Sequence, residues 1–207
     1  MTDAPSTPPV LAALGHAWNA IRANHPEVPA AALTLASRGA SLVKAGHYAH
    51  DRWCMAEGAL PEVFVAAEEL VQGAHEVFHT LLHEAVHGLA DVRGIQDTSR
   101  QGRYHNHRFA ELAGELGLRT VPTSMWGYRS ELDEHTLDPY TAELTVLAGT
   151  LLLWYRARAP RERAVTVTML LRECPCGRKL RGSALAWSGG SVICGTCHQP
   201  FVAPKEH

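Results

Sequence analysis

The chain has 207 residues, 46% of them hydrophobic and 19% charged, which is enough for one or two folded domains with an apolar core. This composition excludes a largely disordered chain and a fibrous one. The first nine residues have no basic start and no apolar core, and the longest apolar stretch, residues 144–154, is far shorter than the roughly 20 residues that cross a bilayer. We therefore expect a cytoplasmic protein without membrane contact, whose five cysteines are reduced.

The net charge of −2 conceals an uneven distribution along the chain. Residues 1–155 carry 10 Lys and Arg against 18 Asp and Glu, a net charge of −8, whereas residues 156–181 carry 8 against 2, a net charge of +6. An acidic body joined to a basic segment favours a partner with negative charge. The simpler interpretation is a solvated, arginine-rich helix end with a linker.

Apolar spacing and turn residues outline the first half of the chain. Residues 1–9 are a flexible tail rich in Pro, Ser and Thr, and residues 10–24 carry apolar side chains at helical spacing up to His25, which precedes a proline. In residues 74–92 the apolar side chains recur three and four positions apart, which predicts a buried amphipathic helix. Between the two helices we expect a small sheet with strands at residues 32–37, 47–54 and 62–67.

The second half is predicted to be mainly helical. A polar loop at residues 95–104 leads into a helix at 105–116. A loop containing Pro and Gly covers residues 121–138, and an apolar helix covers 140–156. Pro160 then marks a linker into a cysteine-rich tail. Helices combined with a separate small sheet predict the α+β fold class.

The strongest motif is the pentapeptide that runs from His83 through Glu84 to His87. On a helix, residues four positions apart share a face, so both imidazoles can reach one metal ion while the glutamate lies beside them. Zn²⁺ accepts nitrogen donors and lowers the pKa of a bound water to about 7, so that a carboxylate can take its proton. The motif therefore predicts zinc-dependent hydrolysis, with Glu84 as the general base.

Two further histidines precede the motif at intervals of four, His75 and His79. A step of four residues drifts by about 40° around a helix, so a longer row of ligands would leave the shared face. We interpret both as partly buried or surface histidines.

The third zinc ligand must come from downstream. A metzincin pattern would need Gly at position 90 and His at position 93. This chain has Ala90 and Arg93, so that subclass is excluded. We favour His105 because Phe109, four residues later, would anchor the following helix in the core while His105 faces the metal. The other candidates are His107, Glu111 and Glu115. On a helix His107 would point about 200° away from His105, and Glu111 and Glu115 fit an exposed helix face.

The C-terminal tail holds two cysteine pairs, each flanked by glycine. The pairs are separated by 17 residues, which is the interval of a four-cysteine zinc ribbon. The first pair has one intervening residue instead of two, and His198 could replace one of the cysteines. Cys54, alone in a predicted strand, is interpreted as a small core residue. The predicted ligands of this structural zinc are Cys174, Cys176, Cys194 and Cys197.

Roughly residues 10–120 resemble the SprT-like metalloproteases, the family that includes the eukaryotic protease Spartan, in the order of their predicted elements and motifs. The resemblance rests on a helix, a small sheet, the HExxH helix, a loop, and a helix start with the spacing of His105 and Phe109. The cysteine-rich tail extends it to the C-terminus. It implies a zincin-like minimal protease domain with His83, His87 and His105 on zinc and Glu84 as base.

The resulting domain division has four parts. A flexible tail at 1–9 precedes a SprT-like metalloprotease domain at 10–138, a helix and basic linker at 139–165, and a zinc ribbon at 166–207. In Spartan the substrates are proteins crosslinked to DNA, so the resemblance implies DNA-associated protein substrates here.

Basic and aromatic side chains lie together in the predicted ribbon. Basic groups can hold a phosphate backbone while an exposed aromatic ring stacks on a base, which is typical of single-stranded DNA binding. The alternative is that Trp187 packs on the small core of the ribbon. A chain that binds DNA would be nucleoid-associated. The candidate residues are Arg178, Lys179, Arg181 and Trp187.

Two functions of different classes follow from these motifs. The first is a zinc endopeptidase with one catalytic and one structural zinc; the second is a non-proteolytic module that docks nucleic acid or protein and whose zincs are both structural. A structural site needs four protein ligands and has no use for Glu84, whereas a catalytic site keeps three ligands and a water. Glu84 therefore favours the enzyme, with Tyr104 and Tyr128 as candidates for stabilising the oxyanion.

Overall fold

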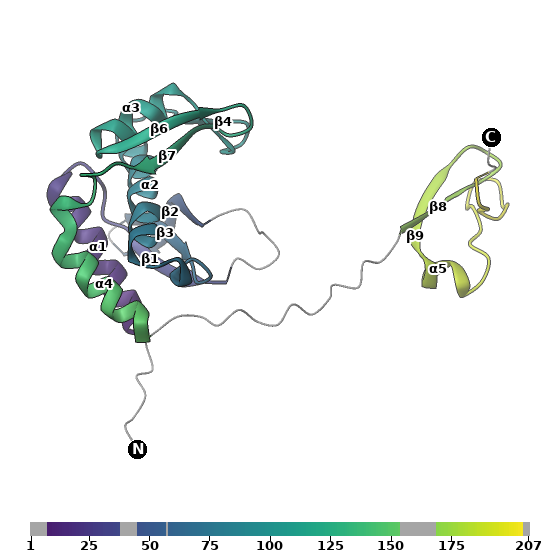
Figure 1. Cartoon of the computed structure of the whole chain (residues 1–207). Coiled ribbons are helices and arrows are strands. Elements are labelled where there is room, and N and C mark those ends of the chain that lie inside the picture. Colours follow the sequence, from purple (N-terminus) through teal and green to yellow (C-terminus); the bar gives the residue numbers. More distant parts are fainter. Residues whose placement is uncertain (1–7, 38–44, 57, 154–168, 205–207) are drawn as a thin grey trace, which may run out of the picture. The chain divides into compact units, whose positions relative to one another are not determined.

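The computed structural model describes residues 8–37, 45–56, 58–153 and 169–204, and the chain divides into two compact units, Met1–Arg158 and Ala159–His207 (Figure 1). Residues 154–168 lie outside the described residues, and they include the linker part of the segment predicted at 139–165 and the start of the ribbon predicted at 166–207. Most of the predicted N-terminal tail lies outside them as well. None of the described helices combines the length and apolar character that crossing a bilayer requires.

Two helices from opposite ends of the first unit pack side by side (Figure 1). The first, α1 (Pro9–Asn24), begins with proline, whose fixed φ suits a first turn. It buries Leu14, Trp18 and Ile21. Its partner α4 (Thr141–Leu153) follows the 3₁₀ turn η2 (Asp138–Tyr140), and Leu147 and Leu151 are its buried residues. The helices predicted at 10–24 and 140–156 are therefore both present, the second as far as the described residues extend.

The predicted three-stranded sheet is confirmed. It has the order β1 (Ala32–Ala36), β3 (Gly58–Ala66), β2 (Gly46–Met55), with β1 parallel and β2 antiparallel to β3. The register of β2 shifts between Ala49 and Trp53, and the second half of β2 is exposed. Cys54 lies in that exposed half, so its interpretation as a core residue is wrong: the β2–β3 hairpin extends past the core at this point.

The central helix α2 (Ala74–Val92) has the predicted bounds and follows the 3₁₀ turn η1 (Leu70–Gln72). It runs between the two sheets of the unit and contacts α1, α3 and α4 as well (Figure 1). Most of its apolar side chains are buried, and Phe78 and Leu82 are fully so. Because α2 is covered on most sides, side chains on its remaining face are held in fixed positions.

A second sheet was not expected from the sequence. It has the order β4 (Thr98–Ser99), β5 (Tyr104–His105), β7 (Gly127–Leu132), β6 (Leu118–Thr123), and so occupies part of the predicted loop at 121–138. Pro122 favours a loop in sequence, but β6 is an edge strand, where a missing N–H is tolerated.

The helix predicted at residues 105–116 is shorter in the structure. It is α3 (His107–Glu115), which begins after Asn106, whose side chain accepts hydrogen bonds from the backbone N–H of Arg108 and Phe109. His105 therefore lies in β5 and not in the helix.

The second unit is small. It contains the hairpin β8 (Met169–Glu173) and β9 (Lys179–Ser183), followed by the short helix α5 (Ala184–Ser188). Its C-terminal segment returns to the hairpin, where Val202 pairs with Glu173. The fold class is thus α+β, and the second unit is compatible with a zinc ribbon.

Candidate metal centres

Three histidines converge in the first unit. His83 and His87 lie one turn apart on α2, and His105 approaches from β5; their ligand nitrogens all lie within 4.8 Å of one another. The Nε2 atoms of His87 and His105 are 3.3 Å apart. The ring of Phe109 packs against all three imidazoles, with centroid distances of 4.2–5.2 Å. Three imidazole nitrogens are a donor set that divalent transition metals accept, so this group could hold a metal ion.

Buried polar groups orient two of these imidazoles. Asp97 Oδ2 lies 2.6 Å from Nδ1 of His87, and Ser130 Oγ lies 2.8 Å from Nδ1 of His83. Ser130 also lies 3.0 Å from Nε2 of His79, and burial lowers the pKa of His79 below its ordinary value. These contacts occupy the Nδ1 atoms and leave Nε2 as the ligand atom, a common arrangement of metal-binding histidines.

Neither Asp97 nor Ser130 was identified from the sequence. Asp97 is an isolated aspartate in a polar loop, and Ser130 falls within the segment that was expected to be a loop. Both are brought to the histidines by pairings in the second sheet. The only signal in the sequence would have been the preference of metal-binding histidines for a carboxylate partner.

Glu84 is 3% exposed and lies on α2 between the two histidines. Gly46 on β2 allows the strand to approach it closely. A Cβ atom at this position would lie 3.0 Å from Glu84 Oε1 and 2.7 Å from Thr80 Cγ2. Gly46 is a further residue of the site that the sequence did not reveal, since one glycine in a turn-rich region carries no distinctive signal.

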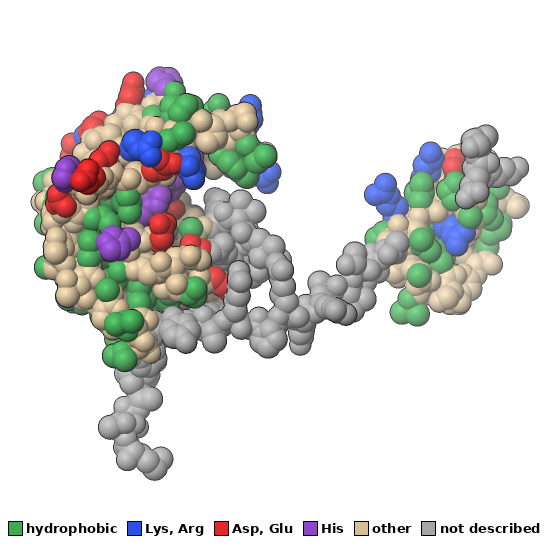
Figure 2. Space-filling view, in the orientation of Figure 1, with side chains coloured by type: hydrophobic (Ala, Val, Ile, Leu, Met, Phe, Trp, Pro, Cys, Tyr) green, Lys and Arg blue, Asp and Glu red, His purple; other side chains and the backbone are tan. Residues whose placement is uncertain are grey.

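The three histidines and Glu84 line a cavity of about 1330 Å³. Acidic side chains outnumber basic Lys and Arg in its lining: of the described lining residues, six are acidic and two are arginines, Arg103 and Arg129. On the face drawn in Figure 2, acidic side chains are likewise spread over the first unit, whereas most of the charged side chains on the second unit are Lys and Arg. At one edge of the cavity the Tyr48 hydroxyl donates a hydrogen bond to Asp91, and burial together with this carboxylate raises the pKa of Tyr48.

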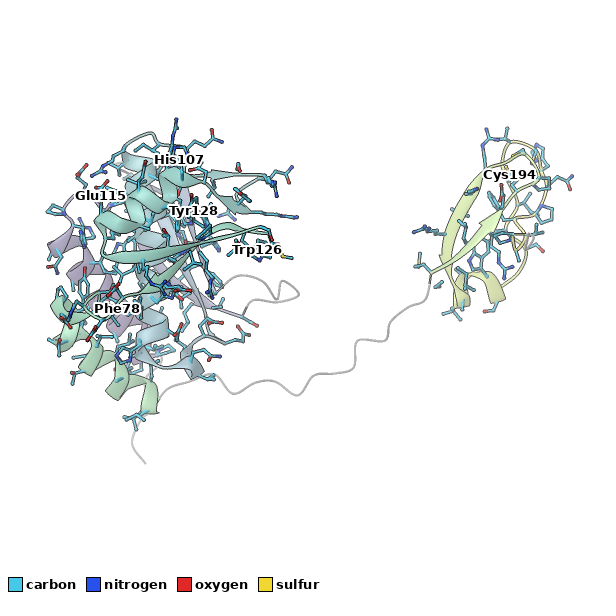
Figure 3. The ribbon with its side chains drawn as sticks, turned by 45° about the horizontal axis from the view of Figure 1, so that its top comes forward. Phe78, His107, Glu115, Trp126, Tyr128 and Cys194 are labelled. Carbon is cyan, nitrogen blue, oxygen red and sulfur yellow. The ribbon has the colours of Figure 1, made fainter. Side chains whose placement is uncertain are left out.

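The other ligand candidates lie away from the histidine group. His107, Glu111 and Glu115 are exposed on α3, and Figure 3 labels His107 and Glu115. Glu115 pairs with Arg93. His75 is exposed as well. His107 was considered unsuitable on the assumption of a helix through His105. This assumption is wrong, because α3 begins at His107, after the Asn106 cap.

The two tyrosines considered for the oxyanion differ in position. Tyr128 on β7 lines the cavity. Tyr104 does not, and the guanidinium of Arg100 lies 4.6 Å from the centre of its ring. Of the two, Tyr128 is therefore the one that lines the cavity of the three histidines.

The second unit brings its four cysteines together. Their sulfur atoms lie within 4.8 Å of one another, and Sγ of Cys174 is 3.1 Å from that of Cys176 and 3.0 Å from that of Cys197. Cys194 completes the group, and His198 does not belong to it. Four sulfur donors could hold a metal ion with closed coordination.

Tight turns shape both cysteine pairs. The turn after Cys176 contains Gly177 at φ +84°, and the turn after Cys197 contains His198 at φ +56°. A hydrogen bond from the Cys174 thiol, together with the guanidinium of Arg178, lowers the pKa of Cys176 to about 6. A lowered thiol pKa favours the thiolate, which is the form that binds metals.

The remaining basic and aromatic candidates lie on the hairpin of the second unit. Lys179 and Arg181 on β9 are exposed, as is Arg178. Trp187 is half-buried against the hairpin: its indole N–H lies 3.0 Å from the carbonyl oxygen of Gly182, and the Arg172 guanidinium lies 5.9 Å from its ring. These contacts favour the alternative that Trp187 packs on its own unit.

Comparison of the chain with family models, curated proteins and solved structures finds no match to any of them. The functional interpretation therefore depends on the geometry of the two ligand groups and on the charge around them.

Proposed function

We propose that the first unit is a zinc-dependent endopeptidase of the SprT-like type. The observation that carries this proposal is the convergence of three histidine ligands beside the buried carboxylate of Glu84, within an open cavity. Three protein ligands and one open position are typical of catalytic zinc, whereas structural zinc has four protein ligands. His83, His87 and His105 would hold the ion.

When bound, zinc supplies Lewis acidity, which polarises a peptide carbonyl and makes a water molecule more acidic. The protein residues then have defined tasks. Glu84 takes the proton from the attacking water and passes it to the leaving amine. Asp97 and Ser130 keep two of the imidazoles in one tautomer and orientation. Tyr128 can donate a hydrogen bond to the carbonyl oxygen as negative charge develops on it.

The second unit is proposed to be a zinc ribbon in which Cys174, Cys176, Cys194 and Cys197 hold a structural zinc. Together with the basic residues around it and in the preceding segment, it would direct the enzyme to DNA-associated or DNA-crosslinked proteins in the cytoplasm or nucleoid. The charge contrast between residues 1–155 and 156–181 supports this part of the proposal.

Glu84→Gln tests the proposed chemistry. An amide cannot accept the proton, so cleavage of an unfolded protein substrate should fall by about 10²–10⁴-fold while the zinc content stays unchanged. Glu111→Gln, which makes the same change on the exposed face of α3, should cleave like the wild type. Equal rates for Glu84→Gln and wild type would exclude Glu84 as the base. Absence of cleavage by the wild type, with several unfolded substrates and with DNA present, would favour the non-proteolytic docking module.

A further inference from the structure

The tip of the β6–β7 hairpin presents two large apolar side chains to solvent. Met125 is 66% exposed and Trp126 is 42% exposed. Trp126 also lines the cavity that contains the three histidines and lies at the hairpin tip in Figure 3. An exposed apolar surface at the edge of a cavity is typical of an interaction site.

The backbone of Trp126 is fixed directly beside a proposed zinc ligand. Its carbonyl oxygen accepts a hydrogen bond from the backbone N–H of His105 at 2.9 Å, and its own N–H donates to Thr123 Oγ1 at 3.1 Å. A ligand that contacts the Trp126 ring from inside the cavity therefore shares this cavity with the histidine group. Trp and Met supply much of the contact area in protein recognition sites.

We propose that Trp126 is a specificity-determining residue that receives a large apolar side chain of an unfolded polypeptide, in the cavity where the peptide bond is cut. This inference rests on the proposed endopeptidase function and adds its substrate class. An unfolded segment exposes the large apolar side chains that a folded protein buries. When such a side chain covers part of the indole ring, apolar surface of both partners is removed from water, and this favours binding.

The charge of the cavity favours a polypeptide over a nucleic acid. Of its described lining residues, six are carboxylates and two are arginines, and Arg129 pairs with Glu131. Even with the charge of a bound Zn²⁺ added to the two arginines, the carboxylates are in excess, so a phosphate backbone would be repelled from such a surface, although an aromatic ring can also stack on a base. A polypeptide with an apolar side chain meets no such repulsion.

The test compares two peptides in the full zinc-loaded chain. One is a short fluorescein-labelled Gly/Ser peptide with a single central phenylalanine, and the other has serine in its place. Affinity is measured by anisotropy in the Glu84→Gln background, so that the peptides stay intact, and cleavage is measured with Glu84 present. Trp126→Ala is compared with Trp53→Ala, because Trp53 is similarly exposed, at 47%, but does not line the cavity.

The phenylalanine peptide should bind about tenfold more tightly than the serine peptide, because half-burying a large apolar side chain contributes roughly that factor. Trp126→Ala should reduce the preference to less than about twofold, whereas Trp53→Ala and Trp126→Phe should keep most of it. Zinc content is measured for each variant, so that loss of the preference is distinguished from loss of the metal.

Two results would overturn the inference: an undiminished preference in zinc-loaded Trp126→Ala, or displacement of the peptide by single-stranded oligothymidylate that depends on Trp126. A Trp126-dependent binding preference without any cleavage by the wild type would instead refute the endopeptidase and keep Trp126 as a site for apolar segments.

Discussion

The carboxylate of Asp97 lies 2.6 Å from Nδ1 of His87, and it is largely buried. It reaches the imidazole from the loop between α2 and β4. Because a charged acceptor at Nδ1 fixes the proton there, it makes Nε2 the better electron donor to a metal. The pair therefore links a loop residue directly to the strength of the proposed zinc site.

Asp97→Asn should weaken zinc binding at the histidine group by about 10–100-fold, which is the usual effect of removing such a partner. Affinity can be measured by competition with a chromophoric chelator. The matched control is Asp138→Asn, because Asp138 also pairs with a histidine, His135, at 3.0 Å, but both side chains are exposed. Equal losses of affinity in both variants would mean that the contact between Asp97 and His87 does not support zinc binding.

Gly127 holds the hairpin against the strand that carries His105. A Cβ at this position would overlap the carbonyl oxygen of His105, and its φ of +76° disfavours any other residue. Gly127→Ala should therefore shift β7 away from β5, reduce metal binding by the histidines and lower the free energy of unfolding by more than the roughly 1–2 kcal/mol of the backbone strain alone.

The control for this change is Gly114→Ala in α3, where an added Cβ meets no atom within 4 Å. Alanine in a helix is favoured over glycine by roughly 0.5–1 kcal/mol, so this variant should unfold at higher denaturant concentration than the wild type. A Gly127→Ala protein with wild-type stability and wild-type metal content would show that the close approach of β5 and β7 is not needed.

Local patterns were sufficient for the elements that the sequence predicted well. The bounds of α2 followed from its apolar spacing, and this placed His83, Glu84 and His87 on one helix. His105 was selected on the assumption that it starts a helix, yet the structure brings it to the histidine group from a strand. The Asn106 cap starts the helix after His105 and so leaves His105 outside it. The strand that contains His105 forms by pairing with Gly127, which lies far away in the sequence, so local spacing could not predict it.

The same limit explains the residues that were missed. Ser130 is placed beside the histidines by the pairing of β7 with β5, and Asp97 by the loop that leads into β4, the other neighbour of β5. Pro122 concealed the hairpin to which β7 belongs. In the second unit the cysteine spacing was informative because all four ligands lie within a short segment.

The separate ligand groups predict two zinc ions per chain. His83→Ala should lose one equivalent and Cys194→Ser the other, since no ligand is shared between the histidine group and the cysteine group. Metal content is measured in protein purified without added zinc, and far-ultraviolet circular dichroism reports whether the first unit stays folded in Cys194→Ser. Loss of both equivalents from either single variant would contradict two independent sites.

The basic C-terminal part of the chain should bind single-stranded DNA more tightly than duplex, and this binding should weaken steeply with salt. The first 155 residues carry a net charge of −8 and should be repelled by phosphates, so the affinity must come from the +6 segment at 156–181. Each neutralised phosphate contributes about −0.7 to the slope of log affinity against log salt on single strands. The double variant Lys179→Ala/Arg181→Ala should therefore reduce that slope by about 1.4.

Fluorescence titration of the full chain at several salt concentrations measures this slope. Arg108→Ala/Arg119→Ala removes two exposed charges from the first unit and should leave the slope unchanged. Trp187→Leu, which keeps an apolar side chain for packing but has no ring to stack on a base, should retain DNA affinity if the indole serves packing, whereas a stacking role predicts weaker binding. A chain that fails to bind single-stranded DNA even at low salt would remove nucleic acid from the proposed function and leave the second unit as a protein-docking or stabilising element.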